Sequence, residues 1–226
     1  MKYLLSLLLI WTIIPTAFSQ EPDENNAAVT VSVEDPQHHP KIGEIVRFHS
    51  TKTKKNFIGK TKSNGKFTIL LPKNDTYDIE LMSFENDFKF NSLAIPNQKG
   101  LLTYQFGITY ELPKTYVLKN VYFDTGKSIL KSSSFPSLNN LAKLLKAKKT
   151  LVIEISGHTD NVGDTNENIA LSEKRAKAVK KYLIKKGVLA SQLQTKGYGD
   201  MQPIADNNTA AGRKKNRRTE VRIIKE

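Results

Sequence analysis

The spacing of apolar residues changes about halfway along this chain, and that change limits the folds it can adopt. Up to about residue 95, apolar and polar residues alternate in short runs, a period of two that is typical of half-buried strands. Beyond about residue 117, apolar residues recur at helical spacing between short strand-like runs. We therefore expect two domains of different fold class, over residues 27–95 and 117–226, connected by residues 96–116.

The first of these segments has the pattern of a small β-sandwich. Apolar and polar residues alternate over Val29–Val33 until Pro36 ends the run. Asn64-Gly65 is a turn sequence, because both residues adopt positive φ at little cost. Similar runs recur about every ten residues, with turn residues between them. This spacing predicts an antiparallel, all-β sandwich.

The second segment alternates strands with helices. Residues 117–123 and Leu151–Ile155 have strand patterns, and the helix between them can be capped by Ser132–Ser134. A second helix is expected from Asp164, which can cap it, to Gly187, which can end it. The last strands are expected at residues 192–196 and 218–224, with a short helix at residues 209–215 between them. The main order, β-α-β-α-β-β, predicts an α/β sandwich.

The first nineteen residues have the pattern of a secretory signal peptide. Lys2 precedes the mostly apolar run Tyr3–Ile14, and small residues at Ala17 and Ser19 fit a cleavage site. Cleavage after Ser19 leaves a polar, flexible start at residues 20–26. The apolar run is shorter than the about 20 residues that span a bilayer, and no later segment is apolar enough to do so. We therefore expect an exported chain without a transmembrane segment and, since no cysteine follows Ser19, without a lipid anchor.

Composition excludes several kinds of chemistry. The chain has no cysteine, which rules out disulfides, thiolate chemistry and zinc sites with thiolate ligands. Of the four histidines, only His38 and His39 are close in sequence, and they lie in a turn-like segment between Pro36 and Pro40. We therefore expect no metal and no cofactor. The net charge is +13, of which residues 1–120 carry +2 and residues 121–226 carry +11. The basic second half admits an anionic partner, although export argues against nucleic acid.

Polar side chains near the start of the second helix form a candidate binding site. Asn168, Ser172 and Arg175 lie at i, i+4 and i+7, so we expect a polar strip beside the apolar stripe. Helical side chains lean towards the helix N-terminus, so Arg175 can reach the loop that holds Asp160. Two arrangements are open: the arginine and the aspartate pair with each other, or they hold the two charges of a zwitterionic ligand.

Motifs in the first half resemble those of carboxypeptidase-regulatory-like (transthyretin-like) domains. They are Thr30–Val33, Gly59-Lys60-Thr61, Asn64–Phe67 and Tyr77–Leu81. The resemblance covers about residues 27–95 and implies a non-catalytic spacer or adhesive module. No polar cluster in this segment suggests catalysis.

Motifs in the second half resemble the OmpA-like family, which includes the C-terminal domain of OmpA, Pal and MotB. They are Val121–Asp124, Ser156–Gly163, Asn168 with Leu171-Ser172 and Arg175-Ala176, Gly197–Gly199, Pro203–Ala205 and Asn216–Arg218. Members bind peptidoglycan non-covalently and are not enzymes. The resemblance, over about residues 117–226, implies a non-catalytic peptidoglycan-binding protein of the periplasm, peripheral to the outer membrane and cell wall.

The same resemblance implies which residues bind the ligand. Asp160 and Arg175 correspond to the pair that grips the diaminopimelate residue of the stem peptide. Arg217 and Arg218 correspond to a pair of which the resemblance leaves open which member faces the ligand. The other implied positions are Phe123, Asp124, Thr125 and Gly126 in one loop, Thr159 and Asn161 beside Asp160, and Asn168 on the second helix.

The sequence supports other functions less well. The basic run Arg213–Arg218 can attract lipopolysaccharide phosphates or nucleic acid, but no aromatic residues are interleaved with it. A wall hydrolase needs paired catalytic groups or a metal, and neither half supplies them. His158 has no second metal ligand at useful spacing and is expected to support its loop. An outer-membrane protein partner stays open.

Overall fold

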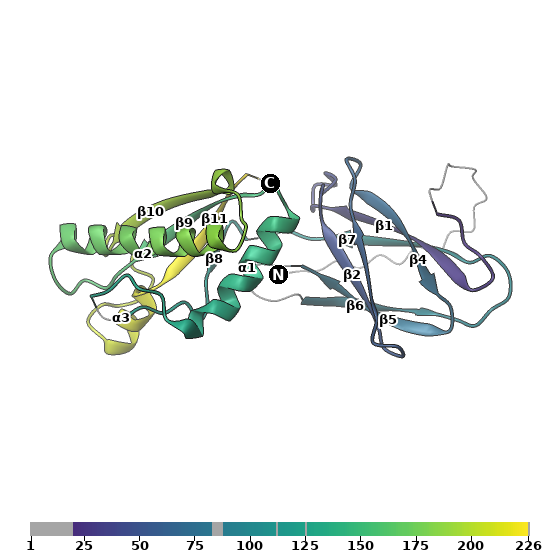
Figure 1. The fold of residues 1–226 in the computed structure, drawn as a ribbon, viewed down its shortest axis with the longest axis horizontal. Helices are drawn as coiled ribbons and strands as arrows, with labels where there is room; N and C mark the ends of the chain where they lie inside the picture. Colours follow the sequence, from purple (N-terminus) through teal and green to yellow (C-terminus); the bar gives the residue numbers. More distant parts are fainter. Residues whose placement is uncertain (1–19, 83–87, 112, 125, 226) are drawn as a thin grey trace. The chain divides into compact units, whose positions relative to one another are not determined.

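The computed structural model describes residues 20–82, 88–111, 113–124 and 126–225 (Figure 1). The predicted signal peptide, residues 1–19, and the candidate site residue Thr125 lie outside the described residues. The chain divides before Pro113 into two compact units. Within the described ranges, no helix is both long and apolar enough to cross a membrane.

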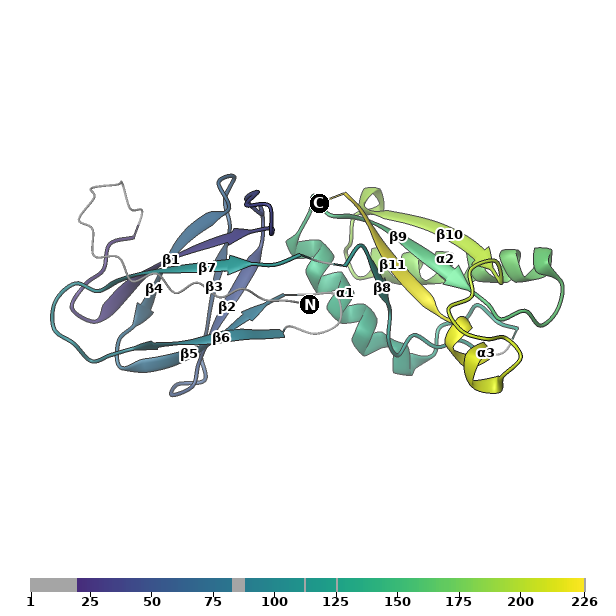
Figure 2. The ribbon, with the colours of Figure 1, turned by 180° about the vertical axis from the view of Figure 1, so that it is seen from behind.

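The first unit consists of two β-sheets, with strand orders β4-β1-β7 and β3-β2-β5-β6 (Figures 1 and 2). Its strands are β1 (Asn26–Glu34), β2 (Ile45–Ser50), β3 (Asn56–Lys60), β4 (Lys66–Pro72), β5 (Asp75–Leu81), β6 (Phe88–Ile95) and β7 (Thr103–Thr109). Alternate side chains of both sheets form one core, in which Val31, Phe48 and Tyr77 are fully buried. The predicted all-β class of this half is confirmed.

Strand β7 lies within residues 96–116, which are predicted to connect the two domains. It pairs with β1 in parallel, from Ala28 opposite Thr103 to Glu34 opposite Thr109. Its Phe106 is buried in the core of the first unit. This pair differs from the antiparallel arrangement expected throughout the sandwich. The chain crosses from one sheet to the other between β6 and β7, and such a crossover allows two strands to run in the same direction.

The Asn64-Gly65 turn forms as predicted, but it joins strands of different sheets. Gly65 has a φ of 69°, and the Lys62 N–H donates to the Lys66 carbonyl at 3.0 Å. The strands on either side, β3 and β4, belong to different sheets. A Cβ on Gly59 of β3 would lie 1.8 Å from the Phe67 ring of β4, so the bare glycine lets the two strands pack closely.

The second unit is built on one four-stranded sheet, with strand order β10-β9-β11-β8 (Figure 2). Its elements are β8 (Thr115–Val117), α1 (Phe135–Ala147), β9 (Val152–His158), α2 (Thr165–Lys185), β10 (Leu193–Gly199), α3 (Ala210–Asn216) and β11 (Thr219–Lys225). The predicted α/β sandwich is confirmed, and the short helix expected near residues 209–215 is α3.

Helices α1 and α2 cover the same face of this sheet. Strand β11 runs antiparallel to both β8 and β9, and β9 is parallel to β10, so α1 and α2 each connect parallel strands. Both crossovers move in the same direction along the sheet, and right-handed crossovers then place both helices on one side. The helices touch through Phe135 and Tyr182, whose rings stack with centroids 4.9 Å apart.

The strand predicted at residues 117–123 is wrong in its bounds. β8 is Thr115–Val117, and Asn120 with a φ of 61° turns the chain out of the sheet. The following residues form a loop that reaches α1. Ser134, expected to cap α1, instead binds this loop, because its hydroxyl accepts a hydrogen bond from the Tyr122 N–H at 2.9 Å. This loop carries the first group of candidate site residues.

The start of α2 is where the sequence analysis expected it. The Asp164 side chain accepts hydrogen bonds from the N–H groups of Asn166 and Glu167, at 2.8 and 3.1 Å. Two glycines then hold α2 close to the sheet. A Cβ on Gly157 of β9 or on Gly197 of β10 would lie 2.2 or 2.4 Å from the backbone of α2. Larger residues would push α2 away from the sheet and displace the site at its N-terminal end.

Gln192 ties the end of α1 to the sheet, and its loss is expected to destabilise the second unit. Its buried side-chain amide nitrogen lies 2.8–3.0 Å from the carbonyl oxygens of Leu145, Lys148 and Leu151. Gln192→Leu leaves these carbonyls without that donor, which should lower the free energy of unfolding by about 2 kcal/mol. Urea unfolding of the full chain measures this. Gln194→Leu, the same change at an exposed position of β10, is the control and should change it by less than about 0.5 kcal/mol.

Candidate functional site

The predicted site residues come together at the carboxyl end of β9. The loop before α1, the loop from β9 to α2, the first turns of α2 and the junction of α3 with β11 all contribute to it. Ligands of open α/β sheets commonly bind at this end of the strands. The sheet and α2 therefore bring together residues that lie up to about 90 positions apart in sequence.

Asp160 is nearly buried, with 8% of its surface exposed, and its carboxylate pairs with Arg217. Its second oxygen accepts a hydrogen bond from the Val162 N–H at 3.3 Å. Of the two arrangements that the sequence left open, a direct pair of Asp160 with Arg175 is not the one observed. The aspartate is held by the other candidate arginine.

Arg175 is a half-buried guanidinium anchored on backbone. Its Nε donates to the Lys127 carbonyl at 3.0 Å and its Nη2 to the Asp124 carbonyl at 3.2 Å. The guanidinium also lies over the Phe123 ring, 5.2 Å from its centroid. Burial lowers the pKa of Arg175, the charge of Arg217 lowers it further, and Asp160 opposes both. Arg175 therefore lies in the electrostatic field of the Asp160–Arg217 pair.

The adjacent arginines Arg217 and Arg218 have different surroundings. The Arg217 side chain is 47% exposed and contacts Asp160. The Arg218 side chain is 6% exposed; it donates to the Glu220 carboxylate at 2.6 Å and to the Gln202 carbonyl at 3.1 Å. Arg217 thus faces the candidate site, while Arg218 lies within the polar network of the sheet.

Asn168 and Ser172 lie on the buried face of α2. The polar strip predicted beside the apolar stripe of this helix is therefore wrong for these two residues. Asn168 donates to the Asp160 and Val162 carbonyls at 3.3 and 3.1 Å, so it fixes the loop that carries the aspartate. Ser172 is fully buried and accepts a hydrogen bond from the Gly199 N–H at 2.9 Å. Both side chains tolerate burial because each finds a backbone partner.

The remaining candidates differ in exposure. Thr159 is buried, and its hydroxyl has no hydrogen-bond partner among the described residues. Asn161 is exposed. Asp124 pairs with Lys131 at 2.8 Å, and this contact lowers the pKa of the Asp124 carboxyl. Gly126 has a φ of 68° and open space around its Cβ position, so the loop is uncrowded there.

A pocket of about 550 Å³ lies between this loop and the first turns of α2. Predicted residues Gly126 and Asn168 line it. The other lining residues are not among the predicted site residues; they are Lys127, Ser128, Ile129, Val162, Gly163, Asp164, Glu167, Ala170, Leu171 and Lys174. Ile129 and Val162 are 71% and 65% exposed. Apolar residues in two otherwise polar loops were the sequence signal that could have pointed to this pocket. The volume suits a small ligand or one segment of a larger one.

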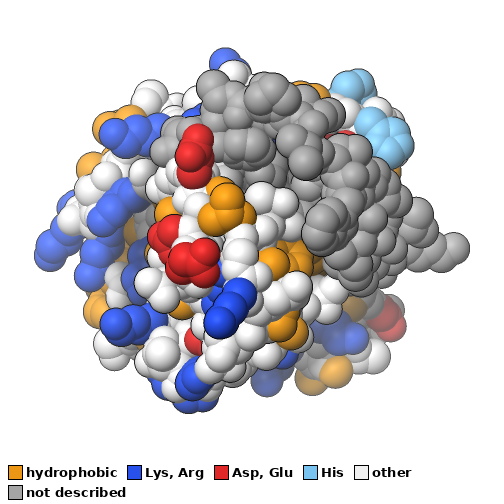
Figure 3. Space-filling view, turned by 90° about the vertical axis from the view of Figure 1, so that its right-hand side faces the viewer, with side chains coloured by type: hydrophobic (Ala, Val, Ile, Leu, Met, Phe, Trp, Pro, Cys, Tyr) orange, Lys and Arg blue, Asp and Glu red, His pale blue; other side chains and the backbone are white. Residues whose placement is uncertain are grey.

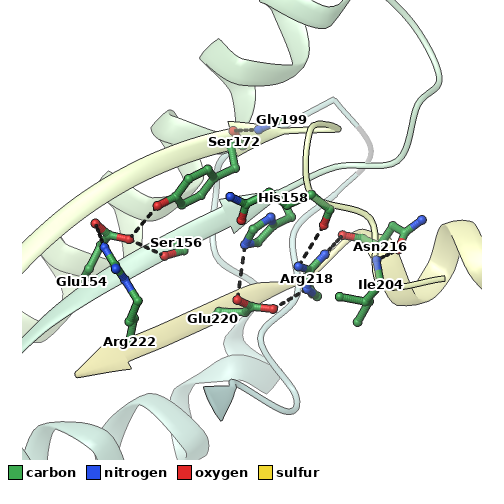
Figure 4. A network of polar contacts seen from close by, with 12 residues as sticks. Glu154, Ser156, His158, Ser172, Gly199, Ile204, Asn216, Arg218, Glu220 and Arg222 are labelled. Atoms are coloured by element: carbon green, nitrogen blue, oxygen red, sulfur yellow. Dashed lines mark hydrogen bonds and ion pairs between the residues drawn. The ribbon is translucent and has the colours of Figure 1, made fainter. Parts of the chain in front are cut away.

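A polar network lies behind the site, on β9, β10 and β11 (Figure 4). Figure 4 shows the Glu220 carboxylate between Arg218 and His158, whose Nε2 lies 3.6 Å away. Contacts with His158 and Arg218 lower the pKa of Glu220 to about 2, although burial opposes them. His158 is buried, and its ring stacks on Tyr198 with centroids 5.3 Å apart. Among the described residues, no group of three histidine or acidic side chains is placed to hold a metal.

The basic run Arg213–Arg218 does not form one continuous surface. Arg213 donates to the Asn207 carbonyl at 2.8 Å, and Asn216 is fully buried. The Asn216 side chain accepts hydrogen bonds from the N–H groups of Ile204 and Ala205, at 2.8 and 3.0 Å (Figure 4). The run ends α3 and leads into β11, and Arg213 and Arg218 are held by contacts within the fold, which weakens the alternative of a polyanion surface here.

The fold and this cluster define an α/β sandwich domain with arginine and aspartate side chains gathered at one end of its sheet. The pocket is lined by neighbouring residues and not by Asp160, Arg175 or Arg217. Residues 122–217 match the OmpA family, and this part of the chain is an OmpA-family domain.

Similar proteins share this half of the chain. Outer membrane porin F of Pseudomonas fluorescens is 41% identical over 104 residues, 46% of this chain and 32% of the porin. The peptidoglycan-binding protein ArfA of Mycobacterium bovis is 41% identical over 101 residues, 45% of this chain and 31% of ArfA. The solved structure of the peptidoglycan-associated lipoprotein of Burkholderia pseudomallei is 30% identical with a TM-score of 0.44, covering 49% of this chain and 90% of that chain. The chain spans about a third of the length of these two curated relatives.

Proposed function

We propose that the second unit binds peptidoglycan non-covalently and does not cleave it. The OmpA-family match and the similarity to a peptidoglycan-binding protein support this class of ligand. The observation that carries the proposal is that the Arg175 guanidinium has hydrogen-bond donors left unused by the described part of the chain. Among the described residues, only two of its five N–H groups find an acceptor, both backbone carbonyls, and no carboxylate pairs with it.

We further propose that the ligand group is the zwitterionic end of diaminopimelate. A half-buried guanidinium is stabilised by a carboxylate, which Arg175 can bind in bidentate fashion. Asp160, beside it, supplies a negative charge for the ligand ammonium, with Arg217 as its partner. Phe123 and the loop that follows it form one wall of this arrangement. Diaminopimelate carries both charges on one side chain, whereas lysine carries only the ammonium.

Binding to isolated sacculi tests the class of ligand. The full chain is expected to co-sediment with sacculi and to release no soluble muropeptides. Binding should persist in the presence of excess DNA, since the proposed ligand is the stem peptide. Failure to sediment, or release of muropeptides, would contradict non-catalytic peptidoglycan binding.

A comparison of two stem peptides tests the finer assignment. The full chain is expected to bind a diaminopimelate peptide at least about thirtyfold more tightly than a lysine peptide, because lysine lacks the carboxylate that would meet Arg175. Arg175→Gln should remove this preference, as measured by calorimetry. Lys214→Gln removes an exposed positive charge from α3 and should leave the preference intact. Equal affinity of the wild type for both peptides would sink the diaminopimelate assignment, but sacculus binding would still support the broader one.

The location and the role of the first unit follow as part of the proposal. We propose that the chain is exported and acts in the periplasm, peripheral to the outer membrane and cell wall. The first unit then acts as a spacer or as an interaction module of the carboxypeptidase-regulatory-like kind, and in the second case its partner is an outer-membrane protein. Residues 21–110 alone are expected not to sediment with sacculi, because the one arginine of this range, Arg47, pairs with Glu80 at 3.0 Å.

A further inference from the structure

A group of lysines lies on the outer side of α1 and α2 and just beyond the end of α1, away from the candidate site. We call it the lysine face; all its members are exposed, and they are Lys143, Lys146, Lys149, Lys177, Lys181 and Lys185. On α2 three of them follow one another at i, i+4 and i+8, opposite the buried residues Ala176, Val179 and Leu183. Both helices cover the same face of the sheet, so both present their outer sides in the same direction.

The two helices bring their lysines together at their C-terminal ends. The Cδ of Lys146 lies 3.7 Å from the Cβ position of Gly187, just after α2. The side chain of Tyr182 stacks on Phe135 and donates to Asn139 at 3.0 Å, which fixes α1 against α2. The lysine face is therefore one surface shared by both helices.

Little negative charge offsets this surface. The sequence has no Asp or Glu from residue 125 to 153, and none from residue 174 to 199. On α2 one lysine of the face, Lys177, has an acidic neighbour, Glu173, at 3.4 Å. Like charges four residues apart destabilise a helix, so this row does not serve the stability of α2. A positive surface of this kind attracts an anionic partner.

The composition of the face favours a lipid surface. The one arginine of the two helices, Arg175, belongs to the candidate site, and the basic residues on their outer sides are all lysines. Lysine is a mobile point charge, whereas arginine suits a fixed bidentate phosphate site. Ile184, the neighbour of Lys185 on α2, and Leu189, just after α2, are 42% and 51% exposed. Lysines around exposed apolar side chains are typical of helices that lie on an anionic membrane surface.

We propose that the lysine face binds the anionic phospholipid headgroups of a membrane surface. Lys181 lies seventeen residues along α2 from Asp164 at the pocket, roughly 25 Å at 1.5 Å per residue. The two surfaces can therefore act at the same time, and a chain that holds the wall through one can rest on a bilayer through the other. The lipid interaction itself does not depend on the proposed peptidoglycan binding.

Vesicle co-sedimentation of the full chain tests this proposal. The wild type is expected to bind vesicles of phosphatidylcholine with about one third phosphatidylglycerol, to bind phosphatidylcholine alone at least tenfold more weakly, and to lose binding at high salt. Lys146→Gln/Lys181→Gln/Lys185→Gln should weaken binding to the anionic vesicles by at least tenfold. Because all three side chains are exposed, its thermal unfolding should match that of the wild type.

The first unit offers a control of equal charge. Lys55→Gln/Lys62→Gln/Lys66→Gln removes three exposed lysines of the sandwich and should leave vesicle binding within about threefold. In the view of Figure 3, Asp and Glu side chains (red) lie among Lys and Arg side chains (blue), so the surface seen there carries charges of both signs. Asp160→Ala should also keep vesicle binding.

Three results would overturn the proposal. The first is an equal loss in both triple variants, which would show that net charge alone drives binding. The second is equal binding to neutral and anionic vesicles. The third is binding to a DNA duplex without binding to anionic vesicles, which would make the partner a soluble polyanion.

Discussion

Asp160→Ala is expected to weaken binding of a diaminopimelate stem peptide by about thirtyfold or more, which corresponds to about 2–5 kcal/mol. Asp160 is 8% exposed and pairs with Arg217. Its removal therefore leaves both Arg217 and the ligand ammonium without a negative partner. Unpaired charges in a partly desolvated site account for losses of this size. Calorimetry with the purified peptide measures the effect.

Two further variants separate charge from packing at this position. Asp160→Asn keeps an oxygen that can accept the Val162 N–H but removes the charge, so it should lose nearly as much affinity as the alanine variant. Asp160→Ala/Arg217→Ala should lose less than the sum of its single variants, because the two side chains contact each other. Normal sacculus binding by a folded Asp160→Ala variant would place the ligand elsewhere.

Local chemistry explains why much of the second unit was predictable. The start of α2 follows from Asp164 and Glu167, whose capping hydrogen bonds involve only neighbours in sequence. The glycines of β9 and β10 were visible as motifs, and the structure gives their reason, the contact of bare backbone with α2. The position of Arg175 on α2 also follows from helical spacing alone.

Long-range pairing explains most of what was missed. Asn168 and Ser172 are polar, so spacing placed them beside the core; their partners in the Asp160 loop and at Gly199 make burial possible. Arg217 and Arg218 are adjacent, and which one faces the site depends on how the chain enters β11. The parallel pairing of β7 with β1 depends on a crossover between sheets. No local pattern encodes such contacts.

The half-buried carboxylate of Glu220 is expected to make the second unit sensitive to acid. Its pKa in the folded protein is about 2, against an ordinary value of 4.5. A carboxyl with a lowered pKa stabilises the fold above its ordinary pKa, and that contribution is lost as the pH falls towards the folded value. A difference of this size corresponds to about 3 kcal/mol at neutral pH, lost progressively between about pH 5 and pH 2.

Glu220→Gln should therefore lower the free energy of unfolding of the second unit by about 3 kcal/mol at pH 7 and by much less near pH 2. The amide keeps an oxygen for Arg218 but removes the charge that this arginine and His158 contact. Urea unfolding followed at the amide of Val221, a buried residue of β11, by NMR reports on the second unit and not on the first. Glu21→Gln, at an exposed position of the first unit, is the control and should leave this value unchanged at every pH. A constant difference between wild type and Glu220→Gln from pH 7 to pH 2 would mean that the side chain stabilises β11 through packing and hydrogen bonding, and not through its charge.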